Sequence, residues 1–264
     1  MTDPIDPADL RDLALGAARA AAVLIRERRT HDVRVADTKT SPTDVVTQAD
    51  RDSEALIRAH ITERRPSDGF LGEEGGSTGG TSGVRWIVDP IDGTVNFLYG
   101  LPQYAVSIAA EVDGEVVAGV VVNAASGVEY VATAGDARRD GVPLSARGPT
   151  PLRRRLVITG FGYEAAKRSV QAQAVARLLP EVRDIRRLGS CALDLCHVAE
   201  GTADAYVEEG VQLWDYAAGA FIARQSGVRV ELHPGAYGTP ALVAGPDHGF
   251  DELMAAVRDA GFLA

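Results

Sequence analysis

Cysteine and histidine are scarce in this chain of 264 residues. The two cysteines, Cys191 and Cys196, lie five positions apart in a segment predicted to be helical, where their side chains point away from each other. A disulfide is therefore not expected, as is usual in a reducing cytosol. The five histidines are scattered without ligand spacing, so a zinc site built from histidine and cysteine is not expected either.

Long apolar runs and an excess of positive charge are also absent. The N-terminal segment has no basic start, and charges interrupt its apolar positions, so neither a signal peptide nor a membrane span is predicted and we expect a cytoplasmic location. The formal net charge is -10, which argues against a general nucleic-acid or anionic-membrane surface. An anionic substrate would need a local counter-charge, which metal ions can supply. Walker A, GxSxG and CxxC motifs are missing as well.

The composition that is present suits a large folded core. Hydrophobic residues make up 45% of the chain. The pattern predicts a helix that begins at Pro7 behind Asp6, and a second helix that carries Asp50 within its apolar stripe. A Gly-rich loop or lid is expected over 75–83, an antiparallel meander over 105–134, and alternating strands and helices later. We expect an N-terminal α+β half over residues 1–150 and a C-terminal α/β half over 151–264.

Acidic residues recur where apolar segments end. In the run from Trp86 to Thr94, a buried strand is predicted to stop at a turn that holds Asp89 and Asp92. Gly93 permits close backbone approach, and the amides of Gly93 and Thr94 at a helix start could receive phosphate oxygens. Glu73 and Glu74 end another apolar piece, and Asp215 is expected to cap an Ala-rich helix.

Each of these acids alone also fits an ordinary structural role: a solvated turn, a surface pair or a helix cap. Together, with no matching basic residues nearby, they indicate a site that cations must neutralise. Ligand sets made only of oxygen atoms favour hard cations such as magnesium.

Five motifs, in this order and spacing, resemble the inositol monophosphatase family of magnesium-dependent, lithium-sensitive phosphatases. They cover nearly the whole chain: Lys39 to Asp50, Gly72 to Glu74, Trp86 to Phe97, Gly189 to Leu193 and Trp214 to Gly219. The resemblance implies a layered αβαβα sandwich of the inositol monophosphatase and fructose-1,6-bisphosphatase type, and a homodimer.

The resemblance also implies a site with two or three Mg²⁺ ions. Glu73, Asp89 and the carbonyl of Ile91 would bind one ion. Asp89, Asp92 and Asp215 would bind a second, and Glu74 would hold a water or an outer ion. Asp50 and Thr94, with Glu73, would orient and activate the attacking water. A paired structural acid is the alternative for Asp50.

The family further implies contacts to a small phosphate ester of a polyol, with myo-inositol 1-phosphate as the expected substrate. Glu208 would accept hydrogen bonds from substrate hydroxyls, although it could merely end a strand. The remaining expected substrate contacts are Asp92, Gly93, Thr94, Gly189, Ser190, Cys191, Ala192, Asp215 and Lys39, the last of which could equally be a solvated loop lysine.

Alternatives to this substrate stay open. Histidinol phosphate, adenosine 3',5'-bisphosphate and fructose 1,6-bisphosphate are substrates of related enzymes, and Arg186 and Arg187 leave a second-phosphate site open, although a surface role suits them equally. Cys191 replaces a more usual alanine, and the Gly-rich insert after Glu74 is long for the family. A non-catalytic binding or regulatory protein that keeps the fold is the alternative from another class.

Overall fold

The structure is a computed structural model that describes residues 5–30, 35–38 and 45–264. Its long helices begin and end where the sequence places capping residues. Asp6 caps the first helix by accepting a hydrogen bond from the Ala8 amide (2.9 Å), with Pro7 at the first helical position. The helices are α1 (Pro7–Arg29), α2 (Gln48–Arg64), α3 (Thr94–Tyr99), α4 (Ala165–Leu178), α5 (Cys191–Ala199), α6 (Leu213–Gln225) and α7 (Phe250–Ala260).

Two large sheets carry most of the strands. The eight-stranded sheet has the order β10-β9-β8-β7-β6-β5-β3-β4 and is antiparallel except for the β3–β5 pair. Its strands are β3 (Gly69–Gly72), β4 (Gly76–Thr78), β5 (Val84–Asp92), β6 (Ala105–Val112), β7 (Glu115–Asn123), β8 (Glu129–Thr133), β9 (Asp136–Arg139) and β10 (Val142–Pro143). The meander predicted over 105–134 is confirmed as β6, β7 and β8.

The second sheet is mixed and has five strands in the order β12-β11-β13-β15-β14. Its strands are β11 (Leu156–Thr159), β12 (Asp184–Arg186), β13 (Ala205–Glu209), β14 (Val228–Pro234) and β15 (Pro240–Pro246). A two-stranded ribbon of β1 (Val35–Thr38) and β2 (Val45–Thr47) completes the described strands.

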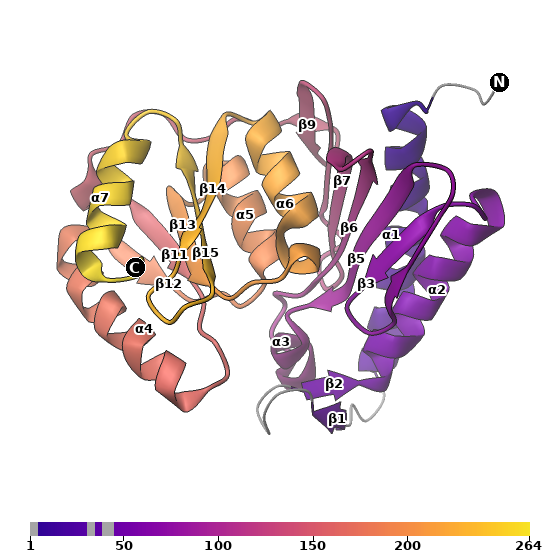
Figure 1. The fold of residues 1–264 in the computed structure, drawn as a ribbon, viewed down its shortest axis with the longest axis horizontal. Helices are drawn as coiled ribbons and strands as arrows, with labels where there is room; N and C mark the ends of the chain where they lie inside the picture. The colour runs from indigo at the N-terminus through magenta and orange to yellow at the C-terminus, as the bar shows by residue number, and fades with distance from the viewer. Residues whose placement is uncertain (1–4, 31–34, 39–44) are drawn as a thin grey trace.

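Helices and sheets alternate as five layers, as Figure 1 shows. Helices α1 and α2 cover one face of the eight-stranded sheet, α5 and α6 lie between the sheets, and α4 and α7 cover the far face of the second sheet. Because strand side chains alternate between faces, Trp86 and Val88 join the outer core while Ile87 joins the central one. The predicted αβαβα sandwich is confirmed.

The central layer packs so closely that backbone meets backbone. A Cβ added at Gly119 of β7 would lie 2.9 Å from the carbonyl oxygen of Ala218, and one added at Gly219 would lie 2.9 Å from that of Ala192. Glycine at these points lets α6 approach both β7 and α5. The central core therefore contains residues from both sides of residue 150. The division at residue 150 stays a prediction.

Two sequence expectations need correction. The Gly-rich segment after Glu74 is not only a loop, because Gly76–Thr78 forms the edge strand β4 beside β3. Asp215 is not the cap of α6. The helix begins one turn earlier with Gln212 as N-cap, and Asp215 lies at the third helical position, where it accepts a hydrogen bond from the Gln212 amide (2.6 Å). The N-cap expected at Asp215 therefore lies three residues after the N-cap that the structure has, Gln212.

The tight α5–α6 contact gives a stability prediction. Gly219→Ala should lower the free energy of unfolding by about 1–3 kcal/mol, because the new methyl group must push back the Ala192 carbonyl and the Leu195 side chain. Denaturant unfolding measures this change. Gly148→Ala is the control, since a Cβ there meets nothing within 4 Å. Equal stability of both variants would show that the helices can separate without loss.

Candidate active site

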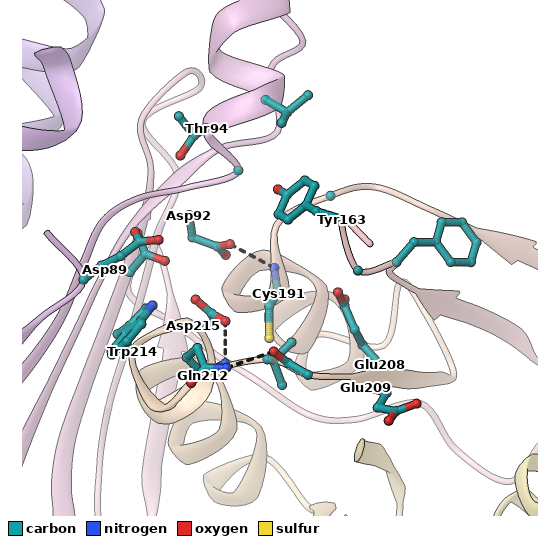
Figure 2. Close-up of a pocket in the computed structure, with 18 of the residues that line it drawn as sticks. Asp89, Asp92, Thr94, Tyr163, Cys191, Glu208, Glu209, Gln212, Trp214 and Asp215 are labelled. Carbon is teal, nitrogen blue, oxygen red and sulfur yellow. Dashed lines mark hydrogen bonds between the residues drawn. The ribbon is translucent and has the colours of Figure 1, made fainter. Parts of the chain in front are cut away.

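A cavity of about 510 Å³ opens where the eight-stranded sheet, α3, α5, α6 and the second sheet meet. Its lining includes Glu73, Asp89, Asp92, Asp215 and Glu208, which come from distant parts of the chain. Figure 2 shows Asp89, Asp92 and Asp215 gathered on one side, with Tyr163 and Glu208 across from them. The fold thus gathers in one place acids that the sequence separates by up to 142 positions (215 − 73).

A bulge in β5 explains how Asp89 and Asp92 reach the same space. Residues three apart on a regular strand point to opposite faces. Here the pairing of β5 with β6 shifts, so that Asp89 lies opposite Ser107 while Asp92 lies opposite Ala105. The extra residue on β5 changes the phase of the strand. Both carboxylates consequently line the cavity.

The start of α5 holds the carboxylate of Asp92. It accepts hydrogen bonds from the Ser190 hydroxyl (2.6 Å) and from the amides of Ala192 (2.7 Å) and Cys191 (3.2 Å). These bonds favour the charged form, as does the helix N-terminus. Burial nevertheless dominates and raises the pKa of Asp92 to about 7. In this structure the backbone around Ala192 binds Asp92, so its role in substrate binding stays a prediction.

The ionised forms of Asp89 and Asp215 are disfavoured by their surroundings. Burial raises the pKa of both well above the ordinary value. The nearby negative charges raise it further: Glu73, Asp92 and Asp215 act on Asp89. Asp89 accepts one hydrogen bond from the Ile91 amide (3.0 Å) and is hydrogen-bonded to Glu73. The four acids repel one another across the cavity, with Asp89 and Asp92 buried and Glu73 and Asp215 half-buried.

Asp50 and Thr94 form a hydrogen-bonded pair at the edge of this cluster. The Thr94 hydroxyl lies 3.0 Å from Oδ1 of Asp50 and 3.0 Å from the Ile91 carbonyl oxygen. The other oxygen of Asp50 accepts from the amide (2.8 Å) and hydroxyl (2.5 Å) of Thr47 in a capping box. Burial raises the pKa of Asp50 to about 6 against these bonds. A buried acid on the apolar stripe of α2 thus reaches the cavity wall through Thr94.

Glu73 is presented by a short loop that Glu54 holds from behind. The buried Glu54 carboxylate accepts hydrogen bonds from the amides of Glu74 and Gly75, both at 2.8 Å. A Cβ at Gly72 or Gly75 would fall within about 2.5 Å of that carboxylate, so glycine is required on both sides of the acid pair. Glu73 lines the cavity and Glu74 does not.

The other predicted site residues divide into two groups. Ile91, Gly93, Thr94, Gly189, Cys191 and Glu208 line the cavity together with the acids, whereas Asp50, Ser190 and Ala192 lie behind it and touch lining residues. Lys39 lies outside the described residues. Sequence reasoning missed Glu54, Lys167 and Thr239. For Glu54 a signal existed, because it falls four positions after Asp50 and three before Ile57 on the buried side of α2.

The donor set fits a hard divalent cation. It consists of carboxylate and carbonyl oxygens, and a cation would relieve the repulsion that raises the pKa values of Asp89 and Asp215. Among the side chains that the structure describes, those of residues 5–30 and 46–264, no three of His, Cys, Asp or Glu already form an ion-binding group. The carboxylates instead turn to hydrogen-bond donors such as Ser190 and the Gln212 amide.

The contacts of Glu54 predict a role in placing Glu73. If the site holds a divalent cation, Glu54→Gln should weaken its affinity by about 10–100-fold, because the loop amides lose a charged acceptor and the loop can shift. Isothermal titration with Mg²⁺ measures the affinity. Glu63→Gln, on the exposed side of the same helix, is the matched control. Unchanged affinity in the Glu54 variant would contradict the positioning role.

Comparisons with known proteins identify the family of this chain. The sequence profile described as the inositol monophosphatase family matches residues 6–260. The chain is 45% identical over 275 aligned positions to a Mycobacterium bovis protein named inositol-1-monophosphatase, covering 96% of this chain and 94% of that one. It is 34% identical to the Escherichia coli K12 protein named Nus factor SuhB, covering 94% and 95%.

Solved structures with the same fold include relatives of this chain. The chain superposes on Mycobacterium tuberculosis SuhB with a TM-score of 0.83 at 43% identity, covering 98% of this chain and 99% of that one. On the Thermotoga maritima IMPase the TM-score is 0.85 at 28% identity, covering 96% and 98%. With a profile match over almost its full length and relatives above 40% identity, this chain belongs to the inositol monophosphatase family.

Proposed function

We propose that this protein is a magnesium-dependent phosphomonoesterase that hydrolyses the phosphate ester of a small polyol, with myo-inositol 1-phosphate as its main substrate. The family supports a phosphatase, and the printed names of the mycobacterial relatives support the inositol ester. The observation that carries the proposal is the convergence of Glu73, Asp89, Asp92 and Asp215 on one cavity beside the Asp50–Thr94 pair.

The family resemblance, together with this convergence, supports the following ion-binding residues. Glu73, Asp89 and the Ile91 carbonyl would hold one Mg²⁺, and Asp89, Asp92 and Asp215 a second, with Asp89 shared. Glu74, which does not line the cavity, would contribute only through a third ion or a water. Bound cations would supply positive charge to the phosphate oxygens and to the leaving alkoxide.

The chain's own residues then move one proton. The Thr94 hydroxyl faces the cavity and can accept a proton from an attacking water while it passes its own to Oδ1 of Asp50. Burial gives Asp50 a pKa of about 6, which keeps it mostly ionised at neutral pH yet basic enough to accept that proton. Water attack forms the new P–O bond as the ester P–O bond breaks, the leaving alkoxide takes its proton from a solvent water, and the proton held by Asp50 returns to solvent; no covalent phosphoenzyme is needed.

This proton path predicts a kcat effect. Asp50→Asn should lower kcat by about 10²–10⁴-fold with little change in KM, because the amide preserves the Thr47 contact but cannot accept the proton. Steady-state phosphate release from myo-inositol 1-phosphate measures both constants. Asp52→Asn, two positions away on α2, where the side chain pairs with Arg28 of α1 and does not line the cavity, should keep kcat within about threefold. A main effect on KM would assign Asp50 a binding role instead.

The crowded acids predict opposite effects on activity and stability. The pKa of Asp89 is raised in the folded chain, so its ionised form is disfavoured by folding. Without cations this cost is absent below the unfolded pKa near 3.8 and grows as pH rises above it. Asp89→Asn should therefore raise Tm in chelator, more at pH 8 than at pH 5, while it abolishes Mg²⁺-dependent phosphate release.

Thermal melts with chelator and with Mg²⁺ at both pH values test this. Asp259→Asn, an exposed change on α7, controls for net charge and should leave Tm unchanged within error. A lower Tm for Asp89→Asn in chelator at pH 8 would mean that the acids do not repel one another. Active Asp89→Asn enzyme would remove Asp89 from the ion site.

We propose further family properties on the resemblance alone: lithium sensitivity, a homodimer and a cytoplasmic location. The two cysteines are free and buried, which suits a reducing compartment. No helix in the described part of the chain is long and apolar enough to cross a membrane. Wild-type protein that releases no phosphate from any phosphomonoester would favour the binding or regulatory alternative, for which the relative named Nus factor SuhB is a reason to look.

A further inference from the structure

The cavity continues beyond the acid cluster to a second wall that the ion-binding residues do not explain. We call it the distal wall and define it by Lys167, Arg187, Glu208, Glu209 and Thr239, all of which line the cavity. Lys167 comes from α4, Glu208 and Glu209 end β13, and Thr239 precedes β15. The substrate portion that lies away from the phosphate must face these groups.

Lys167 is held rigidly against this wall. Only 8% of the residue is exposed, although lysine rarely lies buried. Its stem packs against Gly162, where an added Cβ would lie 2.7 Å from Cδ, and its ammonium lies next to Gly210, where a Cβ would be 2.1 Å from Nζ. Side chains at either glycine would displace it. The backbone on both sides thus leaves room for this one side chain.

The ammonium of Lys167 has donors to spare. It donates one hydrogen bond to the Thr239 hydroxyl (2.9 Å), and Thr239 in turn donates to Oε1 of Glu209 (3.1 Å). An ammonium carries three donors. Its other two donate to no side chain or carbonyl of residues 5–30 and 46–264. A ligand in the cavity can therefore accept a hydrogen bond from Lys167.

The charges of the distal wall cancel. Lys167 and Arg187 are positive, and Glu208 and Glu209 are negative. Glu209 is buried and accepts hydrogen bonds from the amides of Tyr237 and Thr239, while Glu208 accepts one from the Tyr206 hydroxyl (2.8 Å). A second phosphate would meet two carboxylates here as well as two cations. A hydroxyl group can donate to Glu208 and accept from Lys167 at no electrostatic cost.

We propose that Lys167 is a specificity-determining residue that donates a hydrogen bond to a hydroxyl on the part of the substrate remote from the phosphate, so that the charge-balanced distal wall selects polyhydroxylated monophosphates over bisphosphates. This inference rests on the proposed function and deepens it. Thr239 and Glu209 act as positioning residues, because they fix the ammonium without filling its remaining donors.

The test compares Lys167→Met with Arg168→Met. Both remove one positive charge from adjacent positions of α4, but Arg168 is exposed and does not line the cavity. Values of kcat/KM are measured on myo-inositol 1-phosphate, on phenyl phosphate, which has no hydroxyls to read, and on fructose 1,6-bisphosphate. Thermal melts check folding, and Lys167→Gln, which keeps a donor, serves as the milder variant.

In Lys167→Met the ratio of kcat/KM for the inositol ester to that for phenyl phosphate should fall about tenfold, through KM, as expected for one lost hydrogen bond. Lys167→Gln should recover part of it, and Arg168→Met should leave the ratio unchanged. Equal losses on both monophosphates would overturn the proposal in favour of a structural role. A loss confined to the bisphosphate would make Lys167 a second-phosphate anchor instead.

Failure of the proposed function is seen separately. If wild-type protein hydrolyses neither monophosphate, the phosphatase proposal fails. The binding of myo-inositol 1-phosphate to the same variants, measured by calorimetry with Mg²⁺ present, then decides the role of Lys167. Affinity that falls in Lys167→Met and not in Arg168→Met supports it, and equal affinity in the two variants overturns it.

Discussion

Mutual repulsion among buried carboxylates is the constraint on which the rest of this structure depends. Asp89 and Asp92 are buried and Asp215 is half-buried beside them, and burial and neighbouring charge raise the pKa of each. A chain gains no stability from such an arrangement. It persists because surrounding elements fix the acids in place, and the proposed cations would convert the repulsion into binding energy.

The surrounding structure holds these acids in place mainly through backbone geometry and hydrogen bonds, and less through positively charged side chains. The β5 bulge brings Asp89 and Asp92 to one face, the start of α5 satisfies Asp92, and the Glu54 carboxylate holds the Glu73 loop. Helix α6 carries Asp215 and lies against both the eight-stranded sheet and α5 with glycine at the contacts. Helix α6 therefore both carries Asp215 and packs between the two sheets. A shift in the central layer would move Asp215 away from Asp89.

Much of this could be predicted from the sequence because the relevant signals are local. The end of a buried strand in an Asp-Pro-x-Asp-Gly run, the acid on the apolar stripe of α2 and the Gly-Glu-Glu turn each mark a place where polar groups meet the core. The start of α6 was misplaced because Asp215 suits both the N-cap and the third position of a capping box. The strand β4 was missed because glycine and threonine at an exposed edge give no alternation pattern.

The distal wall could be predicted only in part: the family resemblance pointed to Glu208 and left Arg187 open, whereas Lys167 and Thr239 carry no local signal. Lys167 falls on a helix whose other polar residues are mostly solvated, and only the tertiary fold shows that glycines at 162 and 210 leave a channel for its stem. A role for its charge can be inferred only once Glu208 and Glu209 are seen beside it, and these residues lie more than 40 positions later in the sequence. Acids that bind ions occur in motifs of fixed spacing because the coordination chemistry fixes their geometry. A surface that binds substrate hydroxyls can instead be assembled from any donor and acceptor that the fold brings together. The class of reaction can therefore be predicted from a sequence more readily than the choice of substrate.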